Sequence, residues 1–160
     1  MTVRGLQETG QRVRESGALW LGERATTAWI TAVVFSHGNG VEEGPSRWKV
    51  SPEVFGTVTR WGKPRGLCLL AVVHTHLHGI PARLSRADRQ YSVQIPDMLA
   101  VVIGEGGAEL DARRWGWYLY DKHDYRQLLA RELHERFVPE NKERLTVRRA
   151  DADGVWELTK

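Results

Sequence analysis

The fold is decided by residues 67–76, which read Leu67-Cys68-Leu69-Leu70-Ala71-Val72-Val73-His74-Thr75-His76. The first seven are apolar without interruption, the pattern of a central strand that is covered on both faces of its sheet. Polar residues follow at once, so the strand ends at the two histidines. The stretch therefore predicts a buried central β-strand with imidazoles at its C-terminal end.

Outside this strand, apolar periodicity and capping signals predict a chain in which helices and strands are mixed throughout. The expected helices cover residues 3–14, 52–61 after Ser51, 85–91 and 124–137. The expected strands cover residues 18–22, 26–35, 98–103 and 114–120, with turns at 22–24 and 104–107, a loop at 37–45, and a terminal hairpin over 144–160 that turns at 151–154. This pattern favours a single α/β domain over residues 1–160, with a mixed central sheet flanked by helices.

The composition is that of an ordinary globular protein, with 160 residues, 41% hydrophobic and 27% charged. A formal net charge of +3 is too small and too evenly spread to favour nucleic acid as a partner. The single cysteine, Cys68, rules out a disulfide framework and a thiolate zinc site. The sequence has no signal-peptide pattern and no apolar run near the roughly 20 residues of a membrane span, so we expect a cytoplasmic protein that does not bind membranes.

His74 and His76 are two residues apart on a strand, so their side chains project from the same face. Asp88 falls in the first turn of the following helix, from which it can fold back towards the imidazoles. Two imidazoles and one carboxylate leave a fourth position open, as in catalytic zinc sites. Each element also has an ordinary explanation, because a His-x-His pair at a strand end is often incidental and Ser85-x-x-Asp88 is nearly a capping box.

The order of these motifs resembles the JAMM signature of the JAB/MPN+ zinc metalloproteases, in which a glutamate precedes His-Ser/Thr-His and Ser-x-x-Asp. The glutamate of that family lies just before a short strand, as in Glu15-Ser16-Gly17-Ala18-Leu19-Trp20-Leu21-Gly22. The resemblance covers residues 3–120, with an added helix and hairpin over 121–160. It is nearest to the single-domain bacterial (Prok-JAB-like) branch and implies a JAB/MPN-like (cytidine-deaminase-like) fold.

The resemblance also implies roles for individual residues. His74, His76 and Asp88 would bind one Zn²⁺ per chain, Glu15 would act as the general base, and Ser85 would stabilise the oxyanion. The chain departs from the signature in having eight residues between His76 and Ser85 rather than seven, and Leu77 where many relatives have proline.

A second His-x-His pair, His76 and His78, would leave six residues before Ser85. We prefer His74 and His76 because the apolar strand leads directly into His74. His78 is then a loop residue or a group near the substrate.

The implied activity is that of a deubiquitinase-like isopeptidase. Its substrate would be the amide bond after the C-terminal glycine of a ubiquitin-like protein, in precursor processing or deconjugation. Relatives of this size accompany ubiquitin-like activation systems, sulfur-carrier proteins or antiviral defence operons, and the sequence leaves the setting and the oligomeric state open. The alternatives are a peptidase of the same chemistry on a sulfur-carrier adduct or an unrelated protein, and a metal-free scaffold.

Trp115 and Trp117 are weak substrate-binding candidates, since such pairs more often serve sheet packing.

Overall fold

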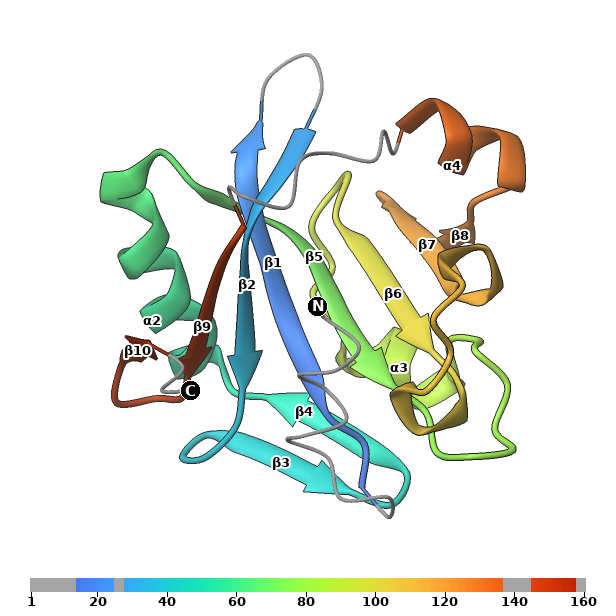
Figure 1. Ribbon diagram of the computed structural model, residues 1–160, viewed down its shortest axis with the longest axis horizontal. Coiled ribbons are helices and arrows are strands. Elements are labelled where there is room, and N and C mark those ends of the chain that lie inside the picture. Colours follow the sequence, from blue (N-terminus) through green and yellow to red (C-terminus); the bar gives the residue numbers. More distant parts are fainter. Residues whose placement is uncertain (1–13, 25–27, 137–144, 158–160) are drawn as a thin grey trace.

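The computed structural model describes residues 14–24, 28–136 and 145–157. The helix predicted over residues 3–14 falls almost entirely outside them. The described part is built on a mixed sheet with the strand order β10-β9-β2-β1-β5-β6-β7-β8 (Figure 1). Its eight strands are β1 (Gly17–Arg24), β2 (Ala28–Ser36), β5 (Cys68–Thr75), β6 (Leu99–Ile103), β7 (Gly116–Asp121), β8 (Asp124–Gln127), β9 (Thr146–Ala150) and β10 (Val155–Glu157).

Strand β5 is a central strand, as predicted from its apolar run. It pairs antiparallel with β1 and parallel with β6, and the side chains of Ala71 and Val73 are 0% exposed. A parallel pair needs a crossover connection, and here the connection includes the predicted helix after Ser85, α3 (Arg86–Tyr91). The end of β5 and the start of α3 are thereby brought to the same edge of the sheet.

The two faces of the sheet carry different layers. On one face the side chains of Trp20, Val73 and Trp117 form part of a core. On the other face Val72 packs with helix α2 (Pro52–Gly62) and with strand β4 (Arg47–Val50), which forms a separate hairpin with β3 (Val41–Gly44). In Figure 1 α2 flanks the sheet, and the β3–β4 hairpin lies across the lower end of β1. Among the described residues, no helix has the length and apolar character needed to cross a membrane.

Several predicted elements are confirmed, namely the helix that begins after Ser51, strands β6 and β7, and the terminal hairpin β9–β10. The turn predicted at residues 22–24 is wrong, because β1 continues to Arg24 and passes Gly22 with a register shift. The loop predicted over residues 37–45 is wrong in its second half, because residues 41–44 form β3. That strand is short and carries two adjacent glutamates, so its sequence has no apolar alternation to reveal it.

The helix predicted over residues 124–137 is wrong at its start. Residues 124–127 form β8, and helix α4 covers only Ala130–Arg136. The turn between β7 and β8 contains Lys122 in the left-handed region at φ 51° and has no glycine, so the usual hairpin signal is missing. The side chain of Tyr125, on β8, is buried and donates a hydrogen bond to the Val93 carbonyl at 2.7 Å.

Gly116, at the start of β7, allows the backbone of the connection between β5 and α3 to pass close to this strand at Ala82. A β-carbon at this position would lie 2.1 Å from the carbonyl oxygen of Ala82, a backbone atom. We expect Gly116→Ala to lower the free energy of unfolding by about 1–3 kcal/mol, because the crossover must move to relieve the overlap. Urea denaturation measures the change.

The matched control is Gly44→Ala in β3, whose nearest non-neighbouring atom would be at 3.5 Å. This variant should stay within about 0.5 kcal/mol of the original chain. Equal losses in the two variants would mean that the close approach at Gly116 does not constrain the crossover.

Candidate metal centre

The two histidines at the end of β5 lie side by side and are almost fully buried. His74 and His76 are each 4% exposed, and their ring centroids are 5.1 Å apart. The backbone of His76 is fixed from two directions: its N–H donates to the Ile103 carbonyl at 2.8 Å, and its carbonyl accepts from the Gly106 N–H at 2.8 Å. Pairing with β6 and the turn after it therefore holds the imidazoles in place.

Asp88 is brought to the histidines by the first turn of α3. Ser85 caps the helix, since its hydroxyl oxygen accepts from the Asp88 N–H at 3.1 Å. In return, Oδ2 of Asp88 accepts from the Ser85 N–H at 2.7 Å, which completes a capping box. The capping residues thus orient a carboxylate whose other contacts are with the imidazoles.

The donor atoms of these three residues have the spacing of metal ligands. Nε2 of His74 lies 3.2 Å from Nε2 of His76, and the Asp88 oxygens lie 3.4 Å and 3.3 Å from these two nitrogens. Ligands about 2.0–2.1 Å from a tetrahedral zinc ion lie about 3.3–3.4 Å from one another. The two imidazole nitrogens have this spacing, and one ligand atom from each of the three residues lies within 4.8 Å of the others, so the trio could hold a metal ion.

The tautomer of His76 also suits metal binding. Its Nδ1 lies 2.9 Å from the carbonyl oxygen of Pro81, which can only accept, so Nδ1 carries the hydrogen. A metal ion would take the place of the proton on Nε2, whose lone pair would then face the shared centre, the arrangement that residues around a metal site impose on metal-binding histidines. Pro81 belongs to the connection between β5 and α3 and precedes Ala82, the residue that packs against Gly116.

Charges in the centre are strongly coupled. Burial opposes ionisation of Asp88, but hydrogen bonds from His74 and His76 outweigh it and hold the pKa of Asp88 well below its usual range. Burial also opposes protonation of His76, while the bonds to Asp88 and Pro81 raise the pKa of that imidazole above its ordinary value. An ionised carboxylate between two imidazoles is a donor set that attracts a divalent cation.

Glu15 lies beside the trio without belonging to it. The residue is 5% exposed, and its backbone N–H donates to the Gly44 carbonyl at 2.9 Å. Its carboxylate accepts a hydrogen bond from the backbone N–H of Trp48, while Oε2 is buried without a hydrogen-bond partner among the described residues. Burial raises the pKa of Glu15, and the nearby His74 and His76 offset this only in part. A buried carboxylate with a free oxygen is suited to exchanging a proton.

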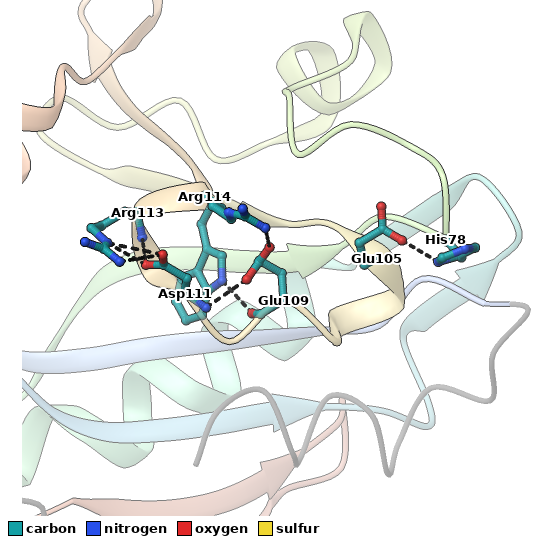
Figure 2. A network of polar contacts seen from close by, with 7 residues as sticks. His78, Glu105, Glu109, Asp111, Arg113 and Arg114 are labelled. Atoms are coloured by element: carbon teal, nitrogen blue, oxygen red, sulfur yellow. Dashed lines mark hydrogen bonds and ion pairs between the residues drawn. The ribbon is translucent and has the colours of Figure 1, made fainter.

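His78 is separate from this centre. Its side chain is 89% exposed, and its Nδ1 forms an ion pair with Glu105 on the connection between β6 and β7. Figure 2 shows this pair at one end of a series of polar contacts along that connection, with the pairs Glu109–Arg114 and Asp111–Arg113 at the other. The geometry therefore brings together His74 and His76 with Asp88, and leaves His78 out.

Trp115 and Trp117 pack in or against the core on the face of the sheet away from His74, and a role for them in substrate binding stays a prediction. Trp117 is opposite Val101 in the β6–β7 ladder, and both belong to the core on the face away from His74. The two indoles stack on each other with ring centroids 5.8 Å apart, and the ring centroid of Trp117 lies 6.0 Å from that of Trp20. Sheet packing accounts for this pair.

Trp48 is a residue of the centre that sequence reasoning missed. It lies on β4, a strand for which the sequence analysis made no prediction, and its ring stacks on that of His74 with centroids 6.2 Å apart. No motif marks it, because its role depends on a hairpin packed against the sheet from a distant part of the chain.

No protein-family model and no curated protein matches the chain. Among solved structures, it is similar to the solution structure of a Desulfitobacterium hafniense protein, with a TM-score of 0.54 and 17% identity, covering 79% of this chain and 85% of that one. It is also similar to a Salinibacter ruber protein, with a TM-score of 0.56 and 17% identity, covering 89% of this chain and 87% of that one. At this identity the likenesses show the fold alone, an α/β architecture with a large mixed sheet.

The metal centre makes a direct prediction about metal content. Purified protein supplied with zinc should hold about one ion per chain, and His76→Ala should lose it because one of three ligands is gone. The matched control is His78→Ala, which removes an exposed imidazole two residues away and should keep the ion. Elemental analysis after gel filtration measures the content. Retention in His76→Ala would overturn the assignment, and loss in both His76→Ala and His78→Ala would favour the other pair, His76 and His78.

Proposed function

We propose that this protein is a zinc-dependent peptidase of the JAB/MPN (JAMM) type, with the JAB-like fold that the sequence resemblance implies. The observation that carries the proposal is the grouping of His74, His76 and Asp88, whose ligand atoms lie within 4.8 Å of one another, next to a buried glutamate outside the group. A donor set of two imidazoles and one carboxylate with an adjacent carboxylate base suits metal-assisted hydrolysis.

Zinc in this centre would supply a Lewis acid that lowers the pKa of a water molecule and polarises the scissile carbonyl. Glu15 would accept a proton from the attacking water molecule as the oxygen of that water bonds to the carbonyl carbon. The carbon–nitrogen bond then breaks, and Glu15 passes the proton to the leaving amine. Burial, which raises the pKa of Glu15, helps this carboxylate to hold the proton between the two transfers.

Ser85 has two roles in this proposal, and they are compatible. Its hydroxyl oxygen already accepts from the Asp88 N–H as a helix cap. The hydroxyl hydrogen is available to donate to the oxyanion that forms on the substrate, because a hydroxyl can accept and donate at once.

The substrate we propose is the amide bond after the C-terminal glycine of a ubiquitin-like protein, cut in precursor processing or deconjugation. A groove beside His74 and Asp88 offers a place for an extended tail. Strand β4 and helix α3 contribute to its walls, and the lining also includes Phe55, Val72 and Val93. Glycine suits the position next to the metal because it has no side chain to clash there. The setting we propose is a bacterial ubiquitin-like or antiviral defence pathway.

The test is a fusion in which a ubiquitin-like domain ends in glycine before a reporter. The zinc-loaded protein should release the reporter, and Glu15→Gln should cut about 10²- to 10⁴-fold more slowly because the proton carrier is lost. Zinc content should be unchanged in this variant, since Glu15 is not a ligand. Glu53→Gln, at an exposed carboxylate in the first turn of α2, is the matched control and should keep full activity.

Other outcomes separate the rival functions. Cleavage of a sulfur-carrier adduct or an unrelated protein, without cleavage of any ubiquitin-like fusion, would keep the chemistry and change the substrate. Failure to bind zinc under any condition would leave the metal-free scaffold as the better account of the chain.

A further inference from the structure

The indole of Trp48 lies flat against the imidazole of His74. Their centroids are 6.2 Å apart and their planes differ by 9°, within the range of offset stacking between aromatic rings. The indole N–H is buried without a hydrogen-bond partner among the described residues. Packing against its neighbours, and not a hydrogen bond of its own, therefore places the ring.

Gly17 provides the space for this contact. It is the partner of His74 in the β1–β5 register, so a side chain there would project from the face on which His74 lies. A β-carbon on Gly17 would lie 2.4 Å from Cε2 of Trp48 and under 3 Å from two further indole atoms. The absence of a side chain at Gly17 is therefore required for the indole to contact the imidazole.

The hairpin that carries Trp48 also holds Glu15. The backbone N–H of Trp48 donates to the Glu15 carboxylate, and the Gly44 carbonyl on the partner strand accepts from the Glu15 N–H at 2.9 Å. The hairpin is not hydrogen-bonded into the eight-stranded sheet as a strand. Its position relative to β5 must therefore come from such side-chain and local contacts, and the contact of Trp48 with His74 is one of them.

We infer that Trp48 is a positioning residue that fixes the β3–β4 hairpin against His74 and so sets both the orientation of that ligand and the place of Glu15. The inference rests on the metal site in the proposed function, and is independent of the choice of substrate. Residues that contact a metal-binding imidazole, and not the metal itself, typically contribute about 10- to 100-fold to metal affinity or activity.

The test compares Trp48→Ala, Trp48→Phe and Trp156→Ala. Trp156 is an exposed indole on β10, so its removal is the matched control. The zinc dissociation constant, measured by competition with a chromophoric chelator, should rise about tenfold in Trp48→Ala. It should stay near the original value in Trp48→Phe, which keeps a flat ring, and in Trp156→Ala. Gly17→Ala should weaken zinc binding as well, because it displaces the same indole without removing it.

A second measurement needs neither metal nor substrate. In NMR spectra of the metal-free protein, the ring resonances of His74 should shift in Trp48→Ala through loss of the indole ring current, while those of His78 stay in place. Circular dichroism confirms that each variant is folded, and Trp48→Leu replaces Trp48→Ala if the smaller side chain prevents folding. Unchanged zinc affinity and unchanged His74 resonances in a folded variant would overturn the inference.

These results separate this inference from the proposed function. If the protein binds zinc but cleaves no ubiquitin-like fusion, the proposed substrate is wrong, and the zinc affinities still decide the role of Trp48. A protein that binds no zinc fails as a metal enzyme, and the His74 resonances then decide whether Trp48 holds that ring.

Discussion

The pairing of β5 on both sides is the constraint on which the rest of the structure depends. Because β1 and β6 fix the register of β5, successive side chains from Ala71 to His74 alternate between two different layers. Val73 enters the core that contains the tryptophans, whereas His74 faces the hairpin and α3. A slip of one residue would exchange the two sets, burying the imidazole among apolar side chains and bringing valine to Asp88.

Asp88 links the fold to the chemistry, because the same carboxylate completes a helix cap and faces two imidazoles. A helix as short as α3 has little stability of its own, so its cap and its packing determine whether it forms. Conversely, the partly buried carboxylate needs the Ser85 N–H and the imidazoles to compensate for its loss of water. Folding of the helix and formation of the centre are therefore one event.

The parts of the site that follow from local sequence could be predicted, and the parts that come from tertiary packing could not. The apolar run before His74 revealed the strand, and the Ser85-Asp88 spacing revealed the helix start, because both are properties of short stretches. The hairpin carrying Trp48 was missed because its strands are short and charged, and β8 was missed because its turn has no glycine. The contact of Trp48 with His74 has no local signature, since it joins distant segments by packing alone.

The centre draws its groups from widely separated points along the chain, and this has a kinetic consequence. Ser16 and Thr75, which are hydrogen-bonded next to it, are 59 residues apart in sequence, and the His76 backbone needs Ile103 and Gly106 from still later in the chain. Contacts of such long range form late in folding, because the entropy of closing large loops must be overcome before they contribute. On the ribosome, the two imidazoles and Asp88 can meet in their final geometry only after the strand that ends at Ile103 has emerged, so a shorter nascent chain has no assembled centre.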